Sequence, residues 1–128
     1  MATIKLVQGD TRPQIKCVIT DETTGAIINL SGAAVALKFR AVGTSSILFT
    51  RTGALLSGIE DSLGVASQYG LTEAYGVAGS GGRVAFQFAA GNLNIEPGAY
   101  EGEIEVTFGD GAIQTIYSPL KFQLRQQF

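Results

Sequence analysis

The chain has 128 residues, a formal net charge of −2 and no histidine. This length fits a single domain, residues 1–128, with its own hydrophobic core. The charge leaves no basic field that would attract nucleic acid or a membrane surface, and the missing histidine excludes Ser-His-Asp, Cys-His and ordinary zinc sites.

Two features of the composition bear on the surface. Charged residues make up 16% of the chain, against roughly 25% in average soluble domains, and glycine is abundant at 17 residues. Either part of the surface is covered by a partner protein, or glycine serves many turns. The one cysteine, Cys17, cannot form an internal disulfide and is interpreted as a small buried hydrophobe.

Segments predicted as strands follow one another along the chain, and most alternate apolar with polar residues. They are 2–7, 14–20, 26–28, 35–40, 47–52, 83–88 and 100–108, followed by a last segment towards the C-terminus. Residues 2–7 lack the basic and continuous apolar regions of a signal peptide, and no apolar run approaches the roughly 20 residues of a membrane span. About seven strands without a long helix predict an antiparallel β-sandwich made and assembled in a cytoplasm.

The glycine-rich stretch 57–82 breaks this pattern and is interpreted as an insertion or mobile loop, with room for a small extra hairpin or helical turn. Loops of this length tend to be functional or disordered. Tyr69 and Tyr75 are its displayed aromatic residues, so they are the candidate contacts for a glycan. Against a glycan site stands the lack of tryptophan, since sugar platforms usually expose flat aromatic rings.

A corner is predicted before the penultimate strand, where Pro97 and Gly98 supply the bend. Tyr100 follows, and its hydroxyl is expected to bond to the backbone of the preceding turn. This arrangement resembles the corner between strands E and F of immunoglobulin-like sandwiches. Near the C-terminus, Ser118-Pro119 separates apolar residues of odd phase from those of even phase, which predicts a bend or bulge.

Glu101, Glu103 and Glu105 share one face of the predicted strand, roughly 6.5–7 Å apart. That spacing is near the range of inverting glycosidases, so a hydrolase is one hypothesis. A solvated row paired with Lys121 and Arg125 on the next strand is the favoured interpretation, and the row could instead set the register of a neighbouring subunit. No metal or cofactor motif is present, because the acidic pairs lack calcium-loop spacing and residues 79–82 do not form a phosphate loop.

Several short motifs, taken in order, resemble one family. They are Gly9-Asp10-Thr11-Arg12-Pro13, residues 29–35 before a strand ending Lys38-Phe39-Arg40, residues 82–88, residues 97–103 and Ser118-Pro119. Together they resemble the N-terminal, immunoglobulin-like domain of tailed-phage baseplate upper proteins, over most of the chain except 57–82.

This resemblance implies a non-enzymatic virion module, without cofactors, that anchors a component to its neighbours, usually as an oligomer. Its implied partners are other virion proteins and further copies of itself, and its location is the virion, assembled in the bacterial host cytoplasm. Members of the family continue beyond the last strand, whereas this chain ends at Phe128. We therefore expect a tail or baseplate adaptor, a neck protein or a capsid-decorating subunit. The alternative is a glycan- or receptor-binding module on the virion surface.

Overall fold

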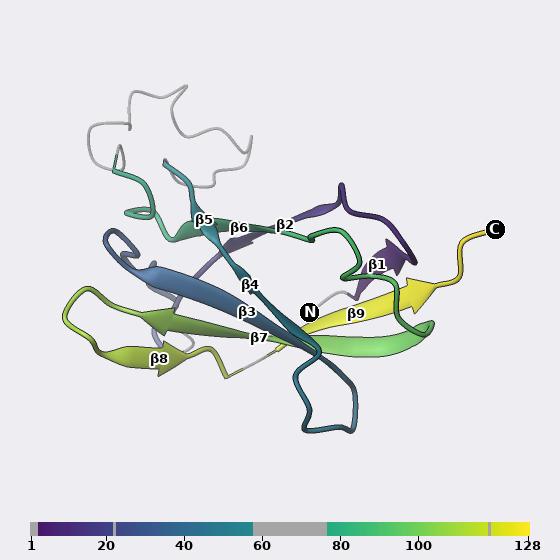
Figure 1. Ribbon diagram of the computed structural model, residues 1–128. Coiled ribbons are helices and arrows are strands. Elements are labelled where there is room, and N and C mark those ends of the chain that lie inside the picture. The colour runs from purple at the N-terminus through teal and green to yellow at the C-terminus, as the bar shows by residue number, and fades with distance from the viewer. Residues whose placement is uncertain (1–2, 22, 58–76, 118) are drawn as a thin grey trace.

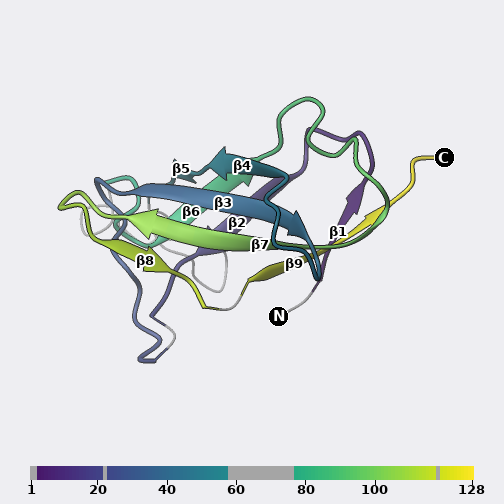
Figure 2. The ribbon, with the colours of Figure 1, turned by 60° about the horizontal axis from the view of Figure 1, so that its bottom comes forward.

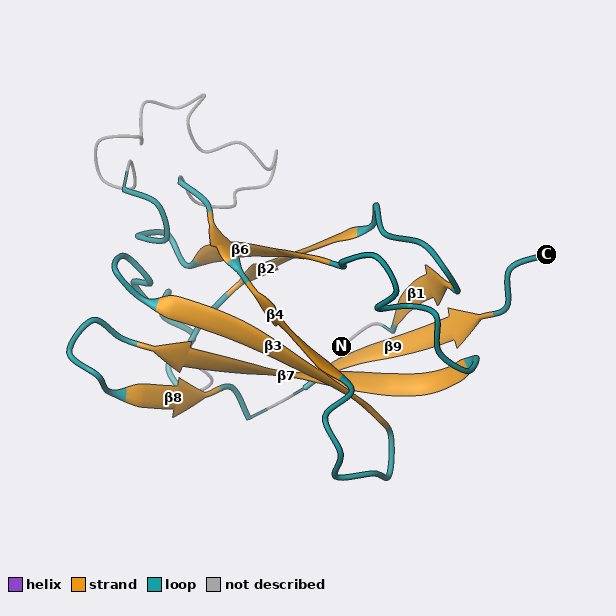
Figure 3. Cartoon of the chain, viewed as in Figure 1, coloured by secondary structure: helices purple, strands orange, loops and turns teal. Residues whose placement is uncertain are grey.

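The fold is that of a computed structural model, which describes residues 3–21, 23–57, 77–117 and 119–128 (Figure 1). Within these ranges the chain forms strands joined by loops and turns, with no helix (Figure 3). Accordingly, the described chain has no helix that could cross a membrane. The strands are β1 (Ile4–Val7), β2 (Gln14–Val18), β3 (Ala34–Ala41), β4 (Phe49–Thr52), β5 (Ala54–Leu55), β6 (Arg83–Gln87), β7 (Gly98–Thr107), β8 (Ile113–Thr115) and β9 (Leu120–Arg125).

The strands form two sheets that pack face to face (Figures 1 and 2). The larger sheet has the order β1-β9-β7-β3-β4, with β8 also paired to β7, and the smaller sheet has the order β2-β6-β5. Leu37 and Phe39 of the larger sheet and Val84 and Phe86 of the smaller sheet are buried between them. The predicted β-sandwich is therefore confirmed, with each sheet directing its apolar face inward.

One strand pair differs from the antiparallel expectation. β1 runs parallel to β9, and Leu6 of β1 lies opposite Leu124 of β9, with both side chains buried. All other paired strands in the described chain are antiparallel. The sequence pattern of residues 2–7 indicates a strand, but the choice of neighbour depends on contacts with a segment more than 100 residues away.

Phe39 is at the centre of an aromatic cluster in the core. Its ring stacks on Phe49 and Tyr100, with centroid distances of 4.6 and 5.3 Å. Phe122 lies tilted at 5.0 Å, and Phe88 presents its ring at 83° and 6.0 Å. Such aromatic pairs add about 0.5–1.5 kcal/mol each beyond the burial of apolar area. The cluster joins β3, β4, β7 and β9 to the segment after β6.

The chain passes from the larger sheet to the smaller sheet at Gly53, the single residue between β4 and β5. Its amide donates to the carbonyl oxygen of Val35 at 2.7 Å. A Cβ atom at this position would lie 2.4 Å from Cγ2 of Val84 and 2.9 Å from Cε1 of Phe86. Glycine is required because the backbone lies against the side chains of Val84 and Phe86 on β6. The short strand β5 that follows was not predicted from the sequence.

Part of the predicted 57–82 insertion is an integral element of the sandwich. The amide of Gly79 donates to the carbonyl of Leu56 at 2.9 Å, and the amide of Leu30 donates to the carbonyl of Gly79 at 2.8 Å. The amide of Ile19 donates to the carbonyl of Gly82, also at 2.8 Å. Residues 77–82 form turns outside the strands, as expected for an insertion or loop, and these backbone bonds connect them to three separate segments. Residues 58–76 lie outside the described residues.

The break predicted near Ser118-Pro119 separates β8 from β9, which both pair with the same edge of β7. Glu105 lies opposite Thr115, whereas Gly102 lies opposite Leu120, so two additional residues enter on the β8–β9 side. This offset confirms a bulge between the two strands. The bulge does not change which side chains face the core. The inward residues of β9 are even-numbered, and the odd-numbered Ile113 and Tyr117 are exposed.

Candidate functional site

The glutamate row of β7 lies on the outer face of the larger sheet, with β3 beside it. Arg40 is directly opposite Glu101, and its Nε lies 2.8 Å from Oε1 of that carboxylate. Lys38 reaches diagonally, placing its Nζ 3.0 Å from Oε2 of Glu105. Glu103, between them, is exposed. Ion pairs of this kind on an outer sheet face contribute only fractions of a kcal/mol.

The expected pairing of this row with Lys121 and Arg125 is not found among the described residues: the ion pairs of the row are with β3 instead. Lys121 lies opposite Glu101 in the β7–β9 register, but the carboxylate of Glu101 binds Arg40 on the other side. The guanidinium of Arg125 lies 4.6 Å from the ring centroid of Phe128 instead. Glu101 has two cross-strand neighbours, Arg40 on β3 and Lys121 on β9, and the sequence pattern does not show which of them is the closer partner.

The chemistry available on this face is that of an ion-paired surface. Glu101 and Glu105 form ion pairs with basic side chains of β3, whereas Glu103 between them is exposed and has no described ion pair. In the part of the chain that the structure describes, no three His, Cys, Asp or Glu side chains are grouped to hold a metal ion. The face carries acidic side chains on β7 beside basic side chains on β3.

The predicted corner lies at the start of β7, with Pro97 just before the strand and Gly98 and Tyr100 within it. The hydroxyl of Tyr100 donates a hydrogen bond to the carbonyl oxygen of Glu96, the residue before Pro97. Burial, and secondarily the negative charge of Glu96, raise the pKa of the Tyr100 hydroxyl above its ordinary value. Because the ring is buried against Phe39 and its hydroxyl is bonded to backbone, Tyr100 is a structural residue.

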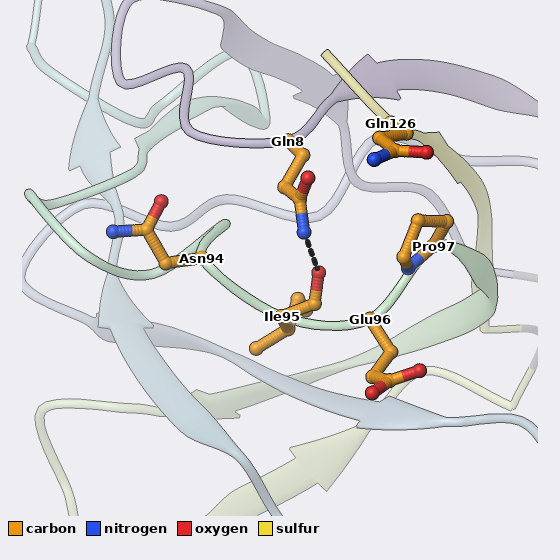
Figure 4. A pocket seen from close by; sticks show the side chains of 6 residues that line it. All are labelled: Gln8, Asn94, Ile95, Glu96, Pro97 and Gln126. Carbon is orange, nitrogen blue, oxygen red and sulfur yellow. Dashed lines mark hydrogen bonds between the residues drawn. The ribbon is translucent and has the colours of Figure 1, made fainter.

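A shallow pocket of about 400 Å³ lies next to this corner (Figure 4). It forms where the chain after β1, the turn before β7 and the chain after β9 meet, and a hydrogen bond of 2.9 Å from Nε2 of Gln8 to the carbonyl of Ile95 crosses it. The lining residues are mostly polar: Gln8, Asn94, Ile95, Glu96, Pro97 and Gln126. In an open pocket, carboxamides can donate and accept hydrogen bonds, and a carboxylate can accept them, so both can bind hydroxyl or amide groups of a ligand. The sequence did not predict it, because its residues come from three distant segments.

Cys17 packs against the core in β2 but is only partly buried, whereas a buried residue was expected. Burial raises the pKa of its thiol from 9.0 to about 11. The thiol is therefore protonated at neutral pH and is a poor nucleophile.

Exposed apolar side chains gather in two places that the sequence analysis did not single out. Val42, Ile47 and Leu48 lie on the loop between β3 and β4, each about half exposed. Ile113 is 65% exposed and Tyr117 is 90% exposed, at and just after β8. Exposed apolar residues in groups are typical of surfaces that bind other proteins. The alternation test missed them because it assigns apolar residues to the interior.

The candidate glycan contacts Tyr69 and Tyr75 lie outside the described residues. The other predicted site residues are placed: the glutamate row on the outer face, and Pro97, Gly98 and Tyr100 at one end of the sandwich. Comparisons with protein-family models, with curated proteins and with solved structures find no match to this chain.

Proposed function

We propose that this protein is a non-enzymatic structural subunit of a phage virion, built on an immunoglobulin-like sandwich and acting through protein–protein contacts. The strand order supports the immunoglobulin-like assignment. The order β9-β7-β3-β4 corresponds to strands G, F, C and C′, and β2-β6-β5 corresponds to B, E and D.

The observation that carries the proposal is the tyrosine corner in its topological place. Tyr100 lies near the start of β7, the strand that corresponds to F, and binds the backbone four residues upstream. This agrees with the family resemblance, in which residues 97–103 are one of the shared motifs. The exposed apolar side chains Val42, Ile47 and Leu48 supply a surface for a neighbouring virion protein. The role proposed within the particle is a tail or baseplate adaptor, a neck protein or a capsid-decorating subunit.

Electron microscopy of particles made without this protein tests the proposal. We expect incomplete or unstable particles, restored by the wild-type protein supplied in trans. An Ile47→Ser/Leu48→Ser variant should restore them less well, whereas Thr50→Ser, an exposed outer-face change on β4, should restore them fully. Unaltered particles in the absence of the protein would contradict the proposal.

The alternative function, a glycan- or receptor-binding module on the virion surface, is favoured by the pocket beside the corner. Its carboxamides and the carboxylate of Glu96 are groups that bind sugar hydroxyls. A glycan array with the wild type, an Asn94→Ala/Gln126→Ala variant and a Tyr69→Ala/Tyr75→Ala variant separates the two possible locations. Absence of binding by the wild type would eliminate this function.

A further inference from the structure

The edge of the larger sheet at β8 has backbone groups that point away from the protein. The amide of Ile116 donates to the carbonyl of Ile104, and the amide of Phe108 donates to the carbonyl of Ala112, so even-numbered residues of this segment bond to β7. In an antiparallel pair the neighbouring residues point their N–H and C=O groups the other way. Ile113 and Thr115 therefore present theirs to the open side, where no described strand pairs with β8.

β1 does not cover this edge, although β8 and β9 flank the same side of β7. Its pairing partners are Phe122–Arg125 of β9, and the two-residue bulge separates these from β8. The segment held by β7 runs from Ala112 to Ile116, so the open edge is longer than the strand itself.

Charge distinguishes β8 from the other edges. Proteins protect exposed edge strands with charged side chains or by keeping them very short. β1, β2 and β4 contain Lys5, Lys16 and Arg51 respectively, and β5 has two residues. Residues 113–117 carry no charge, and two of them are large exposed apolar side chains.

We propose that this edge pairs with the same edge of a second copy of the chain, antiparallel and around a two-fold axis at Thr115. In this register Thr115 faces Thr115 of the other copy, and Ile113 of each copy faces Tyr117 of the other. A β-branched residue opposite an aromatic residue is a favourable cross-strand pair. The larger sheets of both copies would then continue into one another through main-chain hydrogen bonds.

Charge complementarity at the two ends of the edge selects the antiparallel direction. Asp110 precedes β8 and Lys121 follows it, and both are exposed. Antiparallel pairing brings the Asp110 end of one copy to the Lys121 end of the other, whereas parallel pairing would bring like charges together. The second copy is thus one named partner of the proposed structural subunit.

Sedimentation velocity of the isolated protein over a concentration series tests this pairing. We expect dimers for the wild type and monomers for Ile113→Lys/Tyr117→Lys and for Ile113→Glu/Tyr117→Glu, because each variant places like charges opposite one another. A mixture of the two variants should dimerise again. A wild type that stays monomeric, variants that dimerise like the wild type, or a mixture that stays monomeric would each overturn the proposal.

Disulfide trapping tests the register separately. A Thr115→Cys variant in a Cys17→Ala background should cross-link to itself, because hydrogen-bonded antiparallel partners have Cα atoms about 5.5 Å apart, within reach of a disulfide. The matched control is Gln123→Cys, an exposed position on β9 whose two edges are occupied by β7 and β1. Equal cross-linking of both variants would contradict the proposed register. These experiments do not depend on particle assembly. If the protein is monomeric but particles still require it, the pairing is refuted and the proposed structural function is not.

Discussion

The hydroxyl of Tyr100 donates a hydrogen bond to the carbonyl oxygen of Glu96, while its ring stacks on Phe39. One side chain thus holds the turn before β7 and contributes to the aromatic cluster in the core. Because the hydroxyl and the ring have separate partners, their contributions to stability can be separated by substitution.

Tyr100→Phe should lower the free energy of unfolding by about 1–2 kcal/mol, since the carbonyl of Glu96 loses its partner while the ring stack is retained. Urea denaturation measures this change. Tyr117→Phe is the matched control, because Tyr117 is 90% exposed and should change stability by less than about 0.5 kcal/mol. Equal effects of the two substitutions would contradict the role of the corner.

The raised pKa of Tyr100 predicts a loss of stability at high pH. The folded state favours the neutral hydroxyl, whose ordinary pKa is 10.0, so the stabilisation is complete below pH 10 and is lost as the pH rises through the folded-state pKa. Unfolding measured across this range should show a smaller decline for Tyr100→Phe than for the wild type. Parallel declines would show that Tyr100 is not the responsible group.

Gly53→Ala should destabilise the protein by about 1–3 kcal/mol, because the new methyl group overlaps Val84, whose β-branched side chain has little freedom to move. Thermal denaturation gives the measurement. Gly109→Ala is the control, since a Cβ there would meet its nearest atom at 3.5 Å, an ordinary contact. If both variants unfold at the wild-type temperature, the close approach of β4 and β5 to β6 is not a constraint.

Glu101→Gln should cost about 0–1 kcal/mol, and less at high salt, because it removes the ion pair with a partly exposed Arg40. Glu103→Gln, in the same row without a described ion pair, should have no measurable effect. Chemical denaturation at low and high ionic strength compares them. A large, salt-independent loss for Glu101→Gln would indicate a role other than this surface pair.

The Cys17 thiol should react slowly with a thiol reagent at pH 8 in the folded protein. A pKa of about 11 in place of 9.0 lowers the thiolate fraction about a hundredfold, and burial adds to this. In denaturant the rate should rise to that of an ordinary cysteine. A folded-state rate close to the denatured rate would mean that the thiol is accessible.

Alternation along single strands predicted much of the core, but not Leu30 and Leu93, which lie outside the strands, nor Ala85, which was expected to face outward and is buried. Val35, Leu37 and Phe39 are buried as expected, because successive side chains of a strand point to opposite faces and only one face is dry. Pro97-Gly98 and Tyr100 were predictable for a similar reason, since a local turn and one side chain carry the information. The glutamate row was placed on the correct face, but its ion-pair partners were not.

The sequence by itself determined the inward faces, the turns and the all-β class, because these follow from interactions between residues close together in the chain. Only the tertiary structure decided which strands are neighbours: the parallel pairing of β1 with β9, the choice of Arg40 by Glu101, and the open edge at β8. Those features depend on which distant backbones meet, and period-2 alternation is the same whichever neighbour a strand has. The same limit applies to Gly53, whose requirement for glycine comes from a side chain 31 residues further along the chain.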